Sequence, residues 1–200
     1  MREKVFSKDN YVYLLKHLFV TIFLVYLIEI LKKHLEFSEP SHIIGDENIN
    51  FFLILILVII FPVIEEIAFR LSIKKNNFFW LSILFCLIFL LTTKFIIIKI
   101  LLLIFIVLIL INQFLKKINL VVYSTIFLSG LCFLFIHFDN YDKQKLLIMK
   151  PIDFFLLFFP QLFITFIFTK VRIQTFFVNA VLLHIAYNFV ILMLSFLFDT

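Results

Sequence analysis

The chain has 200 residues, of which 64% are hydrophobic and 16% are charged, and its mean hydropathy is +1.16. Soluble domains are nearer half apolar, so this composition excludes an ordinary soluble fold. With 2 glycines and 4 prolines, the sequence has no room for a long flexible linker. The net charge of +5 is modest for a chain of this kind, and we expect no nucleic-acid partner.

Runs of about 20 apolar residues follow one another along the chain, separated by short charged segments. Continuous runs are typical of membrane-spanning α-helices, whereas a membrane β-barrel would show apolar–polar alternation. We therefore predict an all-α fold, a polytopic transmembrane helical bundle of about seven spans within a range of about six to eight. The predicted spans are residues 11–31, 51–73, 78–93, 95–111, 118–138, 152–169 and 176–198.

Two parts are expected along the chain. Residues 1–50 form an N-terminal span and a polar loop, and residues 51–200 form one compact core. Within the core, residues 78–114 contain two short apolar runs that predict a helical hairpin, to which we assign packing only. Residues 139–150 are expected to form a polar loop, and Lys170, Arg172 and Gln174 a short turn.

Lysine and arginine are more frequent on the N-terminal side of the predicted spans than on the opposite side. Because cytoplasmic loops carry an excess of these residues, the N-terminus is expected to be cytoplasmic. The bias toward Phe, Ile and Lys is typical of a bacterial protein and favours the plasma membrane, with the lipid bilayer as surroundings. Cys86 and Cys132 lie inside apolar runs and are expected to be buried free thiols.

Charged residues interrupt the second predicted span. Glu65, Glu66 and Arg70 lie in a run that is otherwise apolar from Phe51 to Ile73, although a charge at mid-bilayer costs roughly 2.5–3.5 kcal/mol. Glu66 and Arg70 are four residues apart and can form an ion pair, whereas Glu65 points about 100° away on the helix. Either these groups form ion pairs that only stabilise the structure, or they take part in a chemical reaction. Pro62, just before them, predicts a kink in the helix.

Two later spans carry further polar side chains at helical spacing. His137 follows Phe133 by four residues, and Asn188 follows His184 by four. A single intramembrane histidine or asparagine is more often an interhelical hydrogen bond than a functional group. Together with the carboxylates, however, two imidazoles and an amide donor match the groups of a water-activating hydrolase.

These patterns resemble the CPBP (Abi) family of intramembrane proteases, which includes the type II CAAX prenyl endopeptidases. The Glu-Glu-x-x-x-Arg motif matches residues 65–70, Phe-x-x-x-His matches Phe133 and His137, and His-x-x-x-Asn matches His184 and Asn188. The motifs occur in the family's order, and the resemblance covers residues 51–198. It implies an intramembrane endopeptidase with a protease core at 51–200.

The sequence departs from the family pattern at two places. Leu71 follows Arg70, where the family usually has glycine. Glu65 and His137 are roughly twice as far apart in sequence as the family's first two motifs, and the excess matches one inserted hairpin at 78–114. In a simple arrangement of seven spans, Glu65 lies toward the inner half of its helix and His137 toward the outer end of its own.

The resemblance also implies roles for the matched residues. Glu65 is expected to be the general base that activates water, with Glu66 and Arg70 orienting it, and His137 is expected to help hold the water. His184 and Asn188 are expected to donate to the oxyanion. No cofactor is required in this version, which we favour. The zinc version stays open, with Glu65, His137 and His184 as ligands.

Other function classes remain open from the sequence. The expected partner is a peptide or protein substrate, such as a leader or C-terminal peptide. A non-catalytic membrane protein on the same scaffold, for bacteriocin immunity or partner binding, is the main alternative. A small transporter with a proton relay is a further one, although the sequence shows no inverted repeat.

Overall fold

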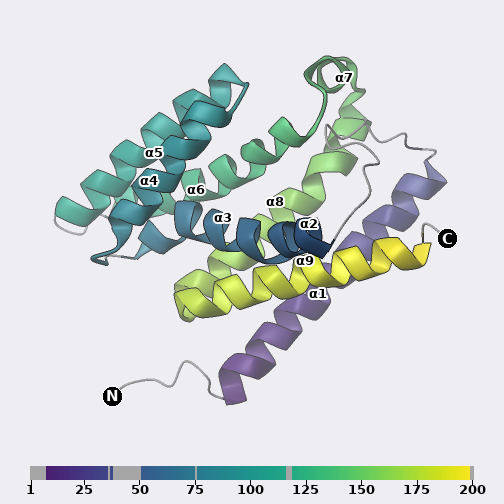
Figure 1. Cartoon of the computed structure of the whole chain (residues 1–200), viewed down its shortest axis with the longest axis horizontal. Coiled ribbons are helices and arrows are strands. Elements are labelled where there is room, and N and C mark those ends of the chain that lie inside the picture. The colour runs from purple at the N-terminus through teal and green to yellow at the C-terminus, as the bar shows by residue number, and fades with distance from the viewer. Residues whose placement is uncertain (1–7, 36, 38–50, 75, 116–118, 199–200) are drawn as a thin grey trace.

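The computed structural model describes residues 8–35, 37, 51–74, 76–115 and 119–198. Helices joined by short connections make up these ranges, and they contain no β-strand (Figure 1). Their bounds are α1 (Lys8–His34), α2 (Phe51–Leu55), α3 (Phe61–Phe69), α4 (Phe79–Thr92), α5 (Ile96–Phe114), α6 (Asn119–Ile136), α7 (Lys143–Ile148), α8 (Pro151–Gln174) and α9 (Phe177–Phe198). Three shorter turns are the π-helical η1 (Ile56–Ile60) and the 3₁₀ turns η2 (Leu71–Ile73) and η3 (His137–Asn140).

The helices have the length and composition of membrane spans. In the described part of the chain, 6 helical segments are long and apolar enough to cross a bilayer, and α4 is a shorter apolar helix. The prediction of an all-α polytopic bundle of about seven spans is therefore confirmed. The chain is an integral membrane protein with transmembrane helices.

Two connections differ from the prediction. The polar segment expected as a loop at 139–150 contains η3 and the short helix α7, whose first turn is capped by Asp142 through the backbone N–H groups of Gln144 and Lys145. The turn expected at 170–174 is wrong, because α8 continues to Gln174. The helix persists there because Arg172 is buried and hydrogen-bonded inside the bundle. Most of the predicted loop between Lys32 and Asn50 lies outside the described residues.

The second span is not one regular helix. It begins as α2, passes through the π-helical η1, continues as α3 and ends in η2. The irregularity lies just before Pro62, which has no backbone N–H and cannot donate to the preceding turn. Where a kink was predicted, the structure has a π-helical turn just before Pro62.

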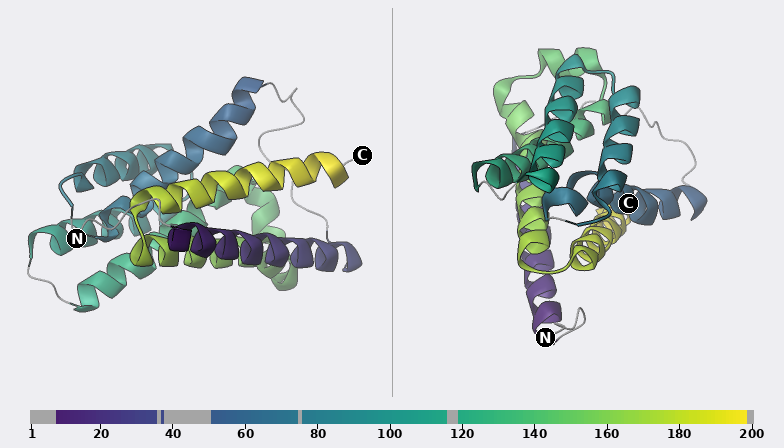
Figure 2. Two further views of the ribbon diagram at one scale, coloured as in Figure 1. Left: turned by 90° about the horizontal axis from the view of Figure 1, so that it is seen from below. Right: turned by 90° about the vertical axis from the view of Figure 1, so that its left-hand side faces the viewer.

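α4 and α5 run alongside each other, as do α1 and α8, whereas α3 and α9 cross the direction of these helices (Figures 1 and 2). α4 and α5 form the predicted hairpin, which packs against α3 and α6. α3 lies beside α9, and α1 packs on α8 and α9. As Figure 1 shows, α3 and α9 run across the direction of α8. The middle of one span can therefore lie beside the end of another.

The interior has an aromatic centre. Phe69 of α3, Phe105 of α5 and Phe133 of α6 are almost fully buried in one hydrophobic cluster. Phe168 of α8 and Leu183 of α9 belong to a second cluster, against which α1 packs. The end of α3 therefore lies where the hairpin meets α6.

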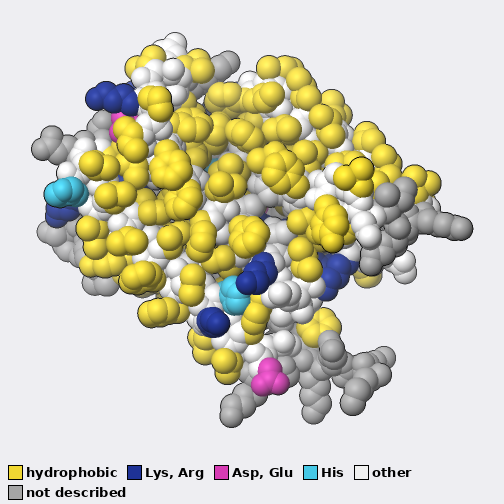
Figure 3. All heavy atoms as spheres, turned by 180° about the vertical axis from the view of Figure 1, so that it is seen from behind, with side chains coloured by type: hydrophobic (Ala, Val, Ile, Leu, Met, Phe, Trp, Pro, Cys, Tyr) yellow, Lys and Arg dark blue, Asp and Glu magenta, His cyan; other side chains and the backbone are white. Residues whose placement is uncertain are grey.

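The surface is strongly apolar. Figure 3 shows one face covered largely by hydrophobic side chains, with the charged groups mostly toward its lower and left margins. Large exposed hydrophobic side chains occur along α1, α4, α5 and α6, for example Phe19, Leu91, Ile96 and Phe127. A soluble monomer rarely exposes patches of this extent, whereas a lipid-facing surface requires them.

Candidate functional site

The end of α3 is anchored by side chains from the neighbouring helices. The last carbonyl groups of a helix have no partner within it, and in an apolar bundle each needs another donor. Here each carbonyl from residue 67 to residue 73 accepts a side-chain hydrogen bond. The donors include Ser82 and Cys86 of α4, Asn112 and Gln113 of α5, Ser129 of α6 and Arg172 of α8.

This anchoring explains the polar residues of the hairpin. Cys86 is buried and free as predicted, and it also donates to the carbonyl of Ala68. Leu71, where the family pattern has glycine, lies in a 3₁₀ turn that residues with side chains adopt readily. The departure at Leu71 therefore leaves the backbone at the end of α3 intact.

Glu66 and Arg70 form a buried ion pair one turn apart on α3. Arg70 Nη1 donates to Glu66 Oε1 at 2.5 Å, and both side chains are 0% exposed. The guanidinium lies over the rings of Phe133 and Phe168, at 4.2 and 5.5 Å from their centroids, and its Nε donates to Thr169 Oγ1 at 3.4 Å. Aromatic faces stabilise a cation that is removed from water. Arg70 is thus fixed on several sides.

His184 of α9 connects the two carboxylates. Its Nδ1 donates to Glu66 Oε1 at 3.0 Å, and its Nε2 lies 3.5 Å from Glu65 Oε2. Because an ionised carboxylate can only accept, Nδ1 carries the hydrogen in this arrangement. Glu66 is fully buried between Arg70 and His184, whereas the side chain of Glu65 remains 16% exposed.

His137 is oriented by its own helix. Its Nδ1 donates to the carbonyl of Phe133 at 2.8 Å, which leaves Nε2 as the acceptor of the neutral ring. The Phe133 ring packs 4.8 Å from the imidazole and also stacks on the guanidinium of Arg70. The Phe-x-x-x-His pattern therefore joins the histidine to the ion pair through one aromatic ring.

Asn188 binds a carbonyl that the π-helical turn sets free. The N–H of Phe61 donates to Ile56, not to Leu57, and the next residue, Pro62, has no N–H to offer. Leu57 thus lacks its usual backbone partners. The side-chain Nδ2 of Asn188 donates to its carbonyl at 3.3 Å. One hydrogen of the Asn188 side-chain amide therefore binds the Leu57 carbonyl, and the second hydrogen takes no part in that bond.

This arrangement predicts coupling between Asn188 and Pro62. The change Asn188→Leu removes the donor to the Leu57 carbonyl, and a buried unpaired group costs about 1–3 kcal/mol. The change Pro62→Ala restores a backbone N–H that can donate to that carbonyl. We expect the double variant to unfold at a higher temperature than Asn188→Leu alone, measured by thermal unfolding in detergent. Additive effects of the two changes would contradict the assigned bond.

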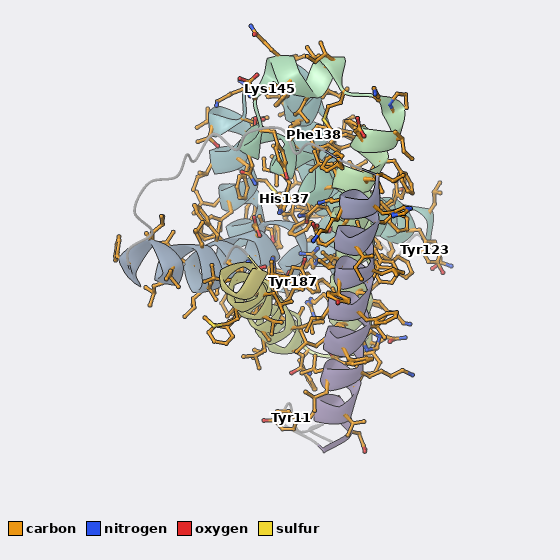
Figure 4. All side chains as sticks on the ribbon, turned by 90° about the vertical axis from the view of Figure 1, so that its right-hand side faces the viewer. Tyr11, Tyr123, His137, Phe138, Lys145 and Tyr187 are labelled. Atoms are coloured by element: carbon orange, nitrogen blue, oxygen red, sulfur yellow. The ribbon has the colours of Figure 1, made fainter. Side chains whose placement is uncertain are left out.

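One cavity of about 490 Å³ brings the predicted site residues together. Glu65, His137, His184 and Asn188 line it. Glu66 and Arg70 lie outside the lining, where Glu66 accepts a hydrogen bond from His184 and pairs with Arg70. Figure 4 labels His137 and Tyr187, which lie in the interior of the bundle, and both belong to the cavity wall.

The expected difference in depth does not separate Glu65 from His137, since both line the cavity. α3, which carries Glu65, crosses the direction of its neighbours and reaches the cavity wall beside η3, which carries His137 (Figure 1). The hairpin also contributes to the wall, through Phe89 and Thr92 of α4. The structural role predicted for the hairpin therefore extends to the wall of the cavity.

Several residues of the site were missed from the sequence. Gln161 lies mid-way along α8 and lines the cavity, as do Asp139 and Asn140 of η3. Arg172 is buried and donates to the carbonyls of Arg70 and Leu71, at 3.0 and 3.2 Å. A glutamine at the centre of an apolar span was a usable signal. The structural role of Arg172 was not recognised from the sequence, because Lys170, Arg172 and Gln174 together resemble a polar turn.

The donor set for zinc does not fit as it stands. In the described part of the chain, no three His, Cys, Asp or Glu side chains come together in a group that could hold a metal ion. Nδ1 of His184 is directed to Glu66, and Nδ1 of His137 to the carbonyl of Phe133. A catalytic zinc needs three protein ligands around an open position.

Comparison with known proteins gives no match. No family model matches the chain, and no curated protein or solved structure is significantly similar to it.

Proposed function

We propose that the chain is an intramembrane endopeptidase of the CPBP type, which hydrolyses a peptide bond with water activated by Glu65. Its substrate is a peptide or protein segment, such as a leader or C-terminal peptide, that reaches the cavity within the membrane. Its setting is a bacterial plasma membrane, with the N-terminus in the cytoplasm.

One observation carries the proposal. Residues from three separate segments, matched by three ordered motifs, line a single cavity, in whose wall Glu65 lies beside His184. If these polar side chains served only to hold helices together, all of their hydrogen-bonding groups would be paired with other helices inside the bundle. Glu65 instead keeps a partly exposed carboxylate in the cavity wall, while the carboxylate beside it is fully buried.

The proposed reaction begins when Glu65 takes a proton from a water molecule in the cavity. The resulting hydroxide attacks the carbonyl carbon of the peptide bond, and the carbonyl oxygen becomes an oxyanion. Glu65 then returns the proton to the amide nitrogen as the C–N bond breaks, which releases a carboxylic acid and an amine. General acid–base catalysis of this kind contributes roughly 10²–10⁴-fold.

The other residues position the reacting groups. Glu66 and Arg70 hold His184, whose Nε2 faces Glu65 and fixes the direction of that carboxylate. Nε2 of His137 accepts a hydrogen bond from the attacking water. The second amide hydrogen of Asn188 donates to the oxyanion, since the first is bound to Leu57.

The test is cleavage of an unbiased reporter. The purified chain, in detergent, carries at its C-terminus a randomised peptide followed by a fluorescent protein. We expect release of the fluorescent protein and, by mass spectrometry of the products, cuts inside the randomised peptide. The same reporter on an unrelated helical membrane protein controls for contaminating proteases. Equal release from both would overturn the proposal and favour the non-catalytic binding or immunity function.

A further inference from the structure

Asp139 is a cavity residue that the reaction above does not use. It lies in η3, two residues beyond His137, and it lines the same cavity as Glu65. A 3₁₀ turn rises about 2 Å per residue, so its backbone lies roughly 4 Å beyond that of His137 along the turn. An extended peptide advances about 3.3 Å per residue. Asp139 is therefore about one or two substrate residues away from the reacting groups.

The carboxylate of Asp139 is held by a backbone hydrogen bond. Its Oδ1 accepts a hydrogen bond from the backbone N–H of Lys94 at 3.1 Å, at the connection between α4 and α5. Among the described residues it forms no ion pair, and its second oxygen accepts no hydrogen bond. The second oxygen can therefore pair with a cation on a bound ligand.

The lining of the cavity has one sign of charge. Its carboxylates are those of Glu65 and Asp139, and no lysine or arginine is among the lining residues that the structure describes. The buried cations Arg70 and Arg172 lie outside the lining, and Arg70 is paired with Glu66. A cleft with apolar walls and charges of one sign concentrates the electric field and attracts the opposite charge.

We infer that Asp139 selects substrates with a lysine or arginine within about one or two residues of the cleaved bond. The side-chain cation pairs with the free oxygen of Asp139, while the peptide bond lies between Glu65 and His137. An acidic residue at that position is repelled by both carboxylates. This inference rests on the proposed endopeptidase function and specifies its substrate class.

The variant Asp139→Asn separates the charge from the structural bond. Asparagine keeps an oxygen that can accept from the Lys94 N–H, but it removes the negative charge. With the randomised reporter, we expect the wild-type chain to cut sequences with Lys or Arg at one fixed position about tenfold more often than neutral ones. We expect Asp139→Asn to lose most of that preference. Asp153→Asn is the matched control, because Asp153 lies on the first turn of α8 and outside the cavity lining.

The outcomes distinguish the inference from the function on which it rests. Cleavage without a basic preference, or a preference that survives in Asp139→Asn, would overturn the inference and leave the endopeptidase standing. If the wild type cuts no sequence, the proposed function fails. Binding then decides the inference, using two photo-crosslinking peptides that differ only by one Lys or Glu. Equal labelling by the two peptides, or a preference for Lys that Asp139→Asn leaves unchanged, contradicts the role of Asp139.

Discussion

The change Arg70→Met should lower the melting temperature of the purified protein by about 6–20 °C. Removing one partner of a buried ion pair leaves the other charge uncompensated, which costs about 3–5 kcal/mol. For a chain of this size, each kcal/mol corresponds to about 2–4 °C. Glu66 is 0% exposed and would retain only His184 as a partner. Thermal unfolding in detergent measures the shift.

Two further variants identify the cause of that loss. Replacing both partners, in Glu66→Leu with Arg70→Met, removes the stranded charge and should recover a large part of the melting temperature. Lys32→Met breaks an exposed ion pair, in which Glu29 is 56% exposed, and should shift it by at most a few degrees. A double variant as unstable as Arg70→Met would show that packing of the arginine against Phe133 and Phe168, and not charge, is decisive.

The fold class was predictable because the bilayer imposes a strong constraint on sequence. A span needs about 20 apolar residues, and the runs of this chain have that length. Helix ends were less predictable where tertiary contacts override local composition. Arg172 is the clearest example: its neighbours in sequence, Lys170 and Gln174, are typical of a turn, but its side chain binds α3 and keeps α8 helical.

The candidate site was predictable only in part. Spacing of four residues identified the pair of Glu66 with Arg70, because that contact is set within one helix. The contact of His184 with Glu66 joins residues 118 positions apart, and periodicity carries no information about it. Likewise, the bond of Asn188 to Leu57 depends on a π-helical turn that Pro62 favours but does not dictate.

Asp139 illustrates a different limit. In the sequence it begins a polar segment, where a carboxylate on a solvated loop is the ordinary interpretation. Its position in the cavity wall follows from η3 and from the backbone N–H of Lys94. Such a contact between the α4–α5 connection and the end of α6 can be recognised only once the hairpin is placed.

The change Glu65→Gln should abolish peptide cleavage, with a loss of at least about 10²–10⁴-fold. Glutamine has nearly the same shape and can still lie beside Nε2 of His184, but it cannot take a proton from water. Because a charge is removed from an apolar environment, we expect the melting temperature to be unchanged or higher. Cleavage of the randomised reporter and thermal unfolding are measured on the same preparation.

A matched control is Glu29→Gln, the same chemical change at an exposed carboxylate on α1, which should leave cleavage unchanged. Cleavage by Glu65→Gln within tenfold of the wild type would exclude Glu65 as the base. Because a zinc ligand at this position would also be lost in Glu65→Gln, the wild type is assayed after dialysis against a chelator. Retained activity together with an inactive Glu65→Gln variant leaves proton transfer as the role of Glu65. Activity lost on dialysis and restored by zinc would instead require His137 and His184 to turn from their present partners toward a metal.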